Sequence, residues 1–512
     1  MGANSTDFGA GADVFSRRSH LLASRYSRDR LKTRALYALL FVLLVARWFT
    51  ETLRLLPRAF NFADLALLGS AIAVLFSGNY WRVARCRFWC TRLSWLVAAF
   101  LSVALLSTAV NLVFYNISIA PAVLSVAFYL EPIVFALTFL ALEWDDEDTR
   151  RLTNLVVLLG VLQIPAAILQ FPQAIVQSDP DAVSGTFGMD NSQMCFFIVL
   201  VVSFMGGRYI LERRKIYLLP LPALVGIFYA AGFKALWYAL PPTVALVVLT
   251  AVPLRLRHKL WFLVATTIIM LGVGLQLGRV TSRTTTSFLK KGYIEDVVNS
   301  GALWQIGKIQ TFTNIPRLYR EVPLATFLGV GPGSYSDRAF FTFTQVSPDP
   351  TADTNVAHGF ISPSDPGRFA NEYYVPLVYK SSYLFGSWTI DGPTTSYVSL
   401  LAEVGLIGFV LYMLIYFRLY KLALATARRA WARRDAQLFG LSIACAIGLL
   451  LLLEMAFLDN WLEVSRVTVP LWLLFVPLLQ STSISPSQLQ AINEHKTNGE
   501  DSGQDEPGGA KA

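Results

Sequence analysis

Long apolar segments recur along almost the whole chain, and this feature limits the folds open to it. A helix needs roughly 20 largely apolar residues to cross about 30 Å of hydrocarbon. About twelve segments of the 512-residue chain fit this requirement. The pattern predicts an all-α polytopic membrane protein with about twelve transmembrane helices. The expected spans are 34–53, 62–79, 93–114, 119–142, 153–172, 192–207, 216–232, 234–253, 259–277, 395–417, 437–457 and 461–480.

Composition agrees with this class. Hydrophobic residues make up 54% of the chain and charged residues only 15%, which is too apolar for an average soluble domain. The formal net charge is +9, but the Lys and Arg residues form short clusters between apolar segments and not one contiguous stripe. This distribution argues against a nucleic-acid-binding protein.

Positive charge predicts the orientation, because short basic loops stay in the cytoplasm. Every second connection is basic or carries basic residues, beginning with the N-terminal segment, and both termini are therefore expected in the cytoplasm. The expected organisation is a basic cytoplasmic N-terminus (1–33), nine transmembrane helices (34–277), one large outward-facing loop (278–394), three further helices (395–480) and a polar, disordered cytoplasmic tail (481–512).

The outward-facing loop carries cations and a glycine-rich turn. Arg279 and Arg283 lie near its start, followed by an amphipathic stretch around residues 304–312. In "GVGPGSYSD", Gly331 and Gly333 would let backbone N–H groups face a bound anion. The cations fit either contact with lipid headgroups or a pyrophosphate site on a lipid-linked substrate, and charge alone does not separate the two.

Glu403 lies in the first turns of the tenth predicted helix, although ionised groups in hydrocarbon are costly and tend to mark function. One hypothesis is a hydrogen-bonded or salt-bridged residue of helix packing. The other is a catalytic carboxylate that orients an acceptor or positions basic residues. Gly405 and Gly408 follow it and permit a close helix approach.

Five segments in order resemble one known family. They are "GTFGMDNSQMCFF" (185–197), "GFKALWYAL" (232–240), "SGALWQIGK" (300–308), "LGVGPGSYSD" (328–337) and "TTSYVSLLAEVGLIGFVLY" (394–412). Their order, with the large loop between the ninth and tenth helices, resembles the O-antigen polymerase and ligase family of bacterial inner-membrane proteins. The resemblance covers roughly residues 185–415.

The resemblance implies a metal-independent glycosyltransferase that needs no cofactor and works on the periplasmic face of the bacterial inner membrane. The donor would be a glycan linked to undecaprenyl pyrophosphate, and the acceptor of a polymerase would be the next lipid-linked repeat unit. Implied partners are this lipid-linked oligosaccharide, membrane lipids, and a chain-length regulator or flippase, but no nucleic acid. Exopolysaccharide or O-antigen biosynthesis would be the process served.

The resemblance also implies site residues. Lys234 stands where family members often carry Arg, and Arg279, Arg283 and Lys308 complete the expected pyrophosphate-binding set. Glu403 and His358 are the catalytic candidates. The expected glycan or acceptor contacts are Tyr335, Arg338, Glu372, Asp391 and Ser396, with Asp459, Glu463 and Arg466 as looser candidates.

One departure bears on the activity. Ligases of the family resemble one another in a histidine shortly before the tenth helix, where this chain has Thr394, Thr395 and Ser396. His358 is the only histidine of the loop and lies well upstream. The departure favours a polysaccharide polymerase over a ligase acting on lipid A core. A lipid-linked glycan transporter and a non-catalytic assembly subunit remain as alternatives.

Overall fold

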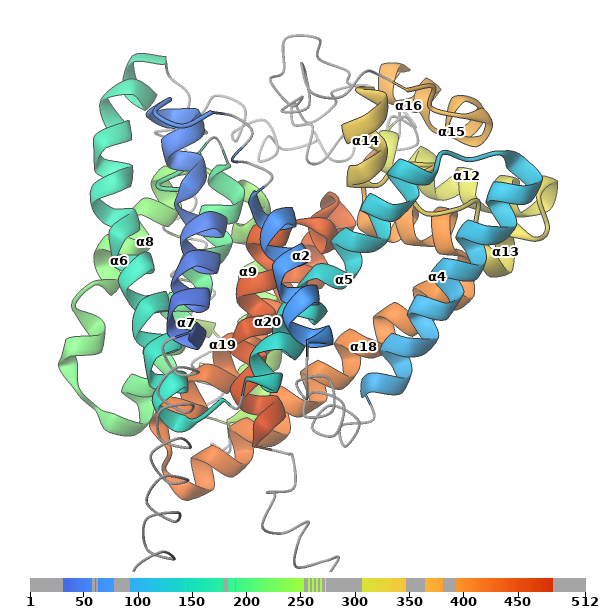
Figure 1. The fold of residues 1–512 in the computed structure, drawn as a ribbon. Coiled ribbons are helices and arrows are strands. Elements are labelled where there is room, and N and C mark those ends of the chain that lie inside the picture. Colours follow the sequence, from blue (N-terminus) through green and yellow to red (C-terminus); the bar gives the residue numbers. More distant parts are fainter. Residues whose placement is uncertain are drawn as a thin grey trace, which may run out of the picture.

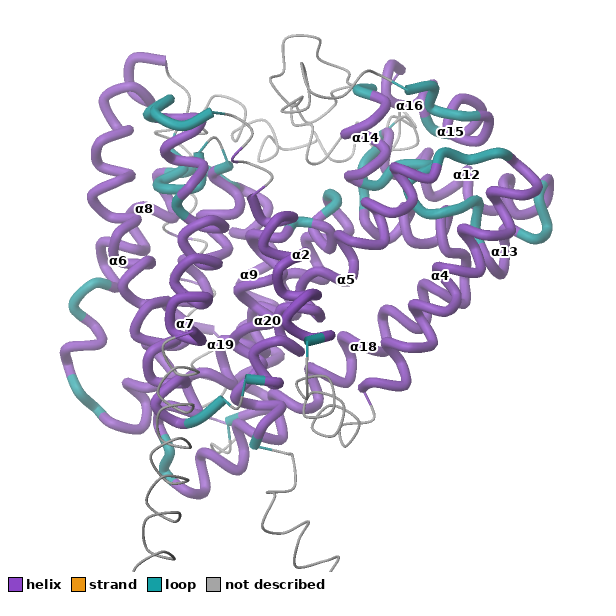
Figure 2. Tube along the Cα trace, viewed as in Figure 1, coloured by secondary structure: helices purple, strands orange, loops and turns teal. Residues whose placement is uncertain are grey.

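The fold is a helical bundle that carries a smaller helical unit at one end (Figure 1). A computed structural model describes residues 31–57, 60, 63–77, 93–142, 144–177, 183–188, 190–252, 306–346, 364–380 and 393–481, together with isolated positions between 257 and 272. Throughout these parts of the chain the secondary structure is helices joined by loops (Figure 2). The predicted all-α class is confirmed for them.

The bundle is built from a helix at residues 31–44, which continues into the π-helical turn η1, and from the longer helices on either side of the predicted loop. The bounds are η1 Trp48–Thr52, α2 Ala63–Phe76, α4 Leu93–Tyr115, α5 Ile119–Ala141, α6 Asp146–Gln177, α7 Asn191–Glu212, η4 Lys215–Leu218, α8 Leu221–Ala230, α9 Lys234–Ala251, α18 Ser396–Arg433, α19 Ala436–Leu458, η6 Trp461–Glu463 and α20 Ser465–Gln480.

Among the described residues, six helices are long and apolar enough to cross a bilayer, namely α4, α5, α6, α7, α18 and α19. Shorter apolar helices cover Ala63–Phe76, Lys215–Ala230, Ala239–Ala251 and Ser465–Gln480. The chain is therefore a helical membrane protein. The figure of twelve spans stays a prediction, and its ninth segment, 259–277, lies largely outside the described residues.

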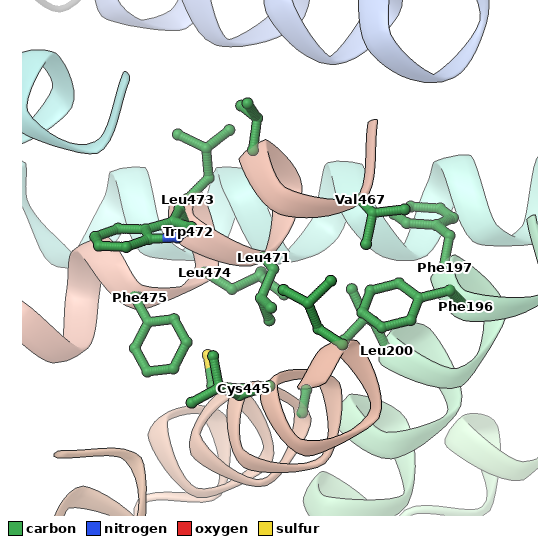
Figure 3. Close-up of a cluster of buried hydrophobic side chains, with 14 of the residues drawn as sticks. Phe196, Phe197, Leu200, Cys445, Val467, Leu471, Trp472, Leu473, Leu474 and Phe475 are labelled. Carbon is green, nitrogen blue, oxygen red and sulfur yellow. The ribbon is translucent and has the colours of Figure 1, made fainter. Parts of the chain in front are cut away.

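Helix α19 forms the centre of the bundle and packs against α7, α9, α18 and α20. Glycines allow one of these contacts, because a Cβ atom on Gly207 of α7 would lie 2.7 Å from the Cα atom of Gly440 in α19. Such close approach through small residues is common between membrane helices. Figure 3 shows the neighbouring core, where Phe196, Phe197 and Leu200 of α7 pack near Cys445 and the side chains of α20.

The chain between α9 and α18 contains a second helical unit, which we call the cap. Its described part comprises residues 306–346 and 364–380, with helices α12 Gly307–Glu321, α13 Ala325–Leu328, α14 Arg338–Thr344, α15 Arg368–Tyr373 and α16 Val375–Lys380. It has its own hydrophobic core, which includes Leu318, Tyr335 and Phe340 and extends to Val398 and Ala402 of α18. The cap is thus a separate core built on the first turns of α18, next to the end of α4 (Figure 1).

Main-chain hydrogen bonds help to attach the cap to α18. The N–H groups of Val330 and Gly331 donate to the carbonyl oxygens of Ala402 and Glu403, at 2.8 and 3.0 Å. Helix α18 bends at this point because Gly405 has φ 69° and ψ −176°. A Cβ atom on Gly405 would lie 2.5 Å from the backbone carbonyl of Phe327. Only glycine fits both this conformation and this contact.

Candidate functional site

The carboxylate of Glu403 is fully buried and is bound by the glycine-rich turn of the cap. Its Oε2 atom accepts a hydrogen bond of 2.9 Å from the N–H of Gly333. Its Oε1 atom accepts from the N–H groups of Tyr335, Ser336 and Asp337, at 3.2, 2.9 and 3.1 Å. Four backbone donors therefore surround one side chain, as in the anion-binding concavities that consecutive N–H groups form.

This arrangement corrects two expectations. The turn does offer backbone N–H groups, but they bind the carboxyl group of Glu403 of the same chain. A carboxylate that is closed off by four donors and has no exposed surface is not placed to orient an acceptor. Of the two hypotheses for Glu403, the geometry fits the hydrogen-bonded packing residue, here between α18 and the cap.

A second group of buried charges lies where the helix at 31–44, α7 and α20 meet. Asp190 precedes α7, and its Oδ2 atom accepts from Nη1 of Arg47 and from Nη1 of Arg466, each at 3.0 Å. Arg47 also pairs with Glu51 at 3.3 Å. The Arg47 and Arg466 side chains are only 15% and 7% exposed, whereas Asp190 is 33% exposed, so the group is open to solvent on one side.

Arg338 of the cap belongs to the same group, because its charge interacts with those of Arg47, Asp190 and Arg466. Asp337 caps α14 by accepting from the N–H of Phe340 at 2.6 Å, which fixes the start of this helix. Glu463 of η6 accepts from the backbone N–H of Arg338, and its carbonyl oxygen accepts from Nη1 at 3.3 Å. The guanidinium then lies 5.0 Å from the centre of the Phe128 ring of α5. We call Arg47, Arg338 and Arg466 the arginine cluster.

Burial and the arginine charges act in opposite directions on the pKa of Asp190, but in the same direction on the pKa of Arg338. Burial alone would raise the pKa of Asp190, but Arg466 and Arg47 outweigh it and hold that pKa below its ordinary value. Burial, followed by the charge of Arg47, lowers the pKa of Arg338. The arginine cluster therefore contains guanidinium groups that repel one another, with Asp190 as the carboxylate that joins two of them.

The cluster has hydrogen-bond donors to spare. In the part of the chain that the structure describes, Arg47 and Arg466 make their hydrogen bonds through Nη1, and the Nε and Nη2 groups have no partner. Guanidinium forks of this kind match the oxygens of phosphate groups. The arrangement can bind a multiply charged anion at the solvent-accessible side of Asp190.

Two further carboxylates lie within electrostatic range of Arg338. They belong to Asp64 at the start of α2 and Glu131 in the middle of α5. Glu131 is fully buried and accepts a hydrogen bond of 2.5 Å from the Ser465 hydroxyl through Oε2, whereas its Oε1 atom has no partner within the described residues. Buried carboxylates within electrostatic range of a cation help to hold that cation in place.

The structure brings only one predicted contact residue, Arg338, into this cluster, together with Glu463 and Arg466 from the looser candidates. Lys308 is buried, and its Nζ donates to the carbonyl oxygen of Thr394 at 2.8 Å, which ties α12 to the start of α18. Glu372 is exposed on the surface of the cap and lies 3.7 Å from Arg317. Within the described residues, neither Lys308 nor Glu372 contacts Arg47, Arg338 or Arg466.

Two expected glycan contacts are corrected by burial. Tyr335 lies in the core of the cap, with its ring 5.4 Å from that of Tyr374, and has no exposed face on which a sugar could stack. Ser396 is buried, and its hydroxyl accepts from the N–H of Leu462 at 3.1 Å, which joins α18 to η6. Arg279, Arg283, His358, Asp391 and the side chain of Lys234 lie outside the described residues.

Arg47 and Asp190 were missed by reasoning from the sequence. Arg47 stands in "LLVARWFTE", close to the outer end of the first predicted span, and Asp190 stands in "FGMDNSQ", just before the sixth. A charge at the border of an apolar segment is ordinarily a surface residue. The predicted topology could have indicated the contact, because it places Arg47, Asp190 and Arg466 at span ends on the same side of the membrane.

No protein-family model matches this chain, and no curated protein matches it.

Proposed function

We propose that this protein is a polysaccharide polymerase of the bacterial inner membrane. It transfers a glycan from undecaprenyl pyrophosphate to a lipid-linked repeat unit on the periplasmic face, with both termini in the cytoplasm. The observation that carries the proposal is the arginine cluster, in which Asp190 joins Arg47 to Arg466 beside Arg338. Ionisable groups buried within a membrane bundle mark substrate sites by default.

The leaving group of such a transfer is a pyrophosphate, and its developing charge needs preorganised donors. Arg47 and Arg466 supply unpaired Nε and Nη2 donors in the described part of the chain, and Asp190 holds both guanidiniums in place. Arg338 adds a third cation from the cap.

The acceptor needs alignment and removal of a hydroxyl proton. Glu131, with its free Oε1 atom, and Asp64 are the carboxylates on the described residues that share the electrostatic environment of Arg338. In this proposal they hold Arg338 toward the leaving group, whereas the sequence offered Glu403 and His358 as candidates for the proton transfer. The resemblance to the polymerase and ligase family, with the ligase histidine missing before α18, favours a lipid-linked acceptor.

Deletion of the gene and gel analysis of surface glycans test this function. The deletion strain should show single repeat units, and the wild-type gene should restore the ladder of long chains. Arg466→Ala and Arg47→Ala should fail to restore it, whereas Arg317→Ala, which removes an exposed arginine of the cap, should succeed. Long chains that stay on the lipid carrier in the deletion strain indicate a ligase, and repeat units trapped in the cytoplasm indicate a flippase. Either result rejects the polymerase.

A further inference from the structure

A cavity of about 680 Å³ lies between the turn that joins α4 to α5 and the cap. This volume is within the range of ligand pockets, about 300–1,000 Å³. The bundle contributes Tyr115, Asn116 and Ser118 to its wall, and the cap contributes Ser334, Thr344 and Asp365.

The lining of the cavity is mixed and nearly neutral. Hydroxyl and amide side chains alternate with apolar ones such as Phe114 and Ile117, and the charged residues of the lining are one cation, Arg368, and one anion, Asp365. Aromatic surface is also present, with the rings of Tyr115 and Phe369 packed edge to face at 4.9 Å. A lipid tail would leave these polar groups unpaired, and a phosphate would require more positive charge. Hydroxyl-rich, uncharged molecules with apolar ring faces fit both parts of the lining.

Two groups of the wall have unused hydrogen-bonding capacity. Asp365 accepts through Oδ1 from Gly367 and Asn371, at 2.9 and 3.0 Å, and its Oδ2 atom has no partner within the described residues. Ser118 occupies the N-cap position of α5, yet its side chain makes no capping hydrogen bond. These groups can bind sugar hydroxyls without giving up an interaction of the fold.

Two helices connect the cavity to the arginine cluster. Pro121 of α5 lines the cavity, and Phe128, which contacts Arg338, lies roughly 10 Å further along the same helix at 1.5 Å per residue. Arg338 and Thr344 stand at the two ends of α14, about 9 Å apart by the same rise. Since α5 and α14 pack together, the two sites are held at one fixed separation.

From this placement we propose that the cavity is a glycan-binding subsite, which holds sugar residues of the lipid-linked substrate while its pyrophosphate lies at the arginine cluster. The placement of the pyrophosphate at the arginine cluster rests on the proposed function. The subsite would determine which repeat unit the protein accepts, because recognition at the arginine cluster is independent of sugar structure.

Binding measurements on the purified full chain in nanodiscs separate the two sites. One probe is farnesyl pyrophosphate, which carries the pyrophosphate without sugar. The other is the repeat-unit oligosaccharide, released by mild acid from the lipid-linked units of the deletion strain. Ser118→Trp and Ser364→Trp fill the cavity from its two walls, and Ser118→Ala is the matched control that leaves it open.

We expect both Trp variants to weaken oligosaccharide binding at least tenfold and to bind farnesyl pyrophosphate like the wild type. Arg338→Ala should show the reverse pattern, and Ser118→Ala should bind both probes within twofold of the wild type. Retained farnesyl pyrophosphate binding also shows that the Trp variants are folded.

The subsite is rejected if both Trp variants bind the oligosaccharide as tightly as the wild type, or if the wild type binds farnesyl pyrophosphate but not the oligosaccharide. If the wild type binds the oligosaccharide and not farnesyl pyrophosphate, the subsite stands and the proposed function fails. If it binds neither probe, both fail.

Discussion

Glu403 and Gly333 are 70 residues apart in sequence, and the Oε2 atom of the first accepts a hydrogen bond of 2.9 Å from the backbone N–H of the second. With the three donors on Oε1, this bond fixes the glycine-rich turn to α18. The same turn leads directly to Asp337 and Arg338, so the packing of one buried carboxylate determines where the arginine of the cap lies.

Glu403→Gln should destabilise the protein. An amide keeps one acceptor oxygen for the three donors on Oε1, but its NH₂ group then faces the N–H of Gly333. A buried donor left without its partner costs about 1–3 kcal/mol. Thermal unfolding in detergent and limited proteolysis of the cap measure the effect. Glu372→Gln, at an exposed residue of the cap, is the control and should change stability by less than about 0.5 kcal/mol.

The same variant distinguishes packing from catalysis. A Glu403→Gln protein with wild-type stability and no polymer formation would contradict the packing role and support a catalytic one.

Gly329→Ala should detach the cap from α18. Gly329 has φ +71°, and a Cβ atom there would overlap the backbone of Glu403. Both effects are unfavourable, and we expect a loss of at least about 2 kcal/mol. Gly206→Ala in α7 is the matched control, because a Cβ atom there meets nothing within 4 Å and alanine favours the helix by up to about 1 kcal/mol. Equal melting temperatures for the two variants would exclude the close contact.

Not only Arg466→Ala but also Arg466→Lys should strongly reduce polymer formation. Lysine keeps the charge but loses the fork of donors that serves Asp190 and an incoming phosphate oxygen together. Removal of one donor to a developing anion typically costs about a hundredfold in rate. The measurement is the rate of chain growth in membranes supplied with lipid-linked repeat units, with Arg317→Lys as the control. Normal rates in Arg466→Lys would indicate that a point charge is enough.

Asp190 predicts a pH dependence. Its folded-state pKa lies below the ordinary value of about 3.8, so its contribution to stability is fully present above that value and is lost as the pH falls through the lower folded pKa. Wild-type melting temperature should therefore fall more steeply below about pH 4 than that of Asp190→Asn, and the variant should be less stable at neutral pH. Parallel curves for the two proteins from pH 6 to 3 would show that Asp190 gains nothing from Arg47 and Arg466.

Reasoning from the sequence predicted the helical class and the positions of most helices, because the length of apolar segments is a local property. It also indicated an amphipathic stretch near helical spacing around residue 309, where α12 begins at Gly307. Gly408 does not carry the expected close helix approach, because an added Cβ would lie 2.6 Å from Val404 of its own helix and at an ordinary contact distance, 3.5 Å, from Val103 of α4. Gly405 serves a different purpose, the contact with the cap.

The arginine cluster was not predictable in the same way. Asp190 is 143 residues from Arg47 and 276 from Arg466, and nothing local in either segment indicates the pairing. The role of Glu403 was ambiguous for a related reason. A carboxylate in an apolar helix has the same sequence signature whether its partner is a substrate or four backbone N–H groups of a distant turn.

The join between cap and bundle includes main-chain hydrogen bonds at Val330 and Gly331, with glycine where the two backbones touch. Side chains on the outside of the cap play no part in this seam, so they are free to diverge without loosening it. Residues on the outer surface of the cap can therefore change while these backbone contacts keep the cap at one position on α18.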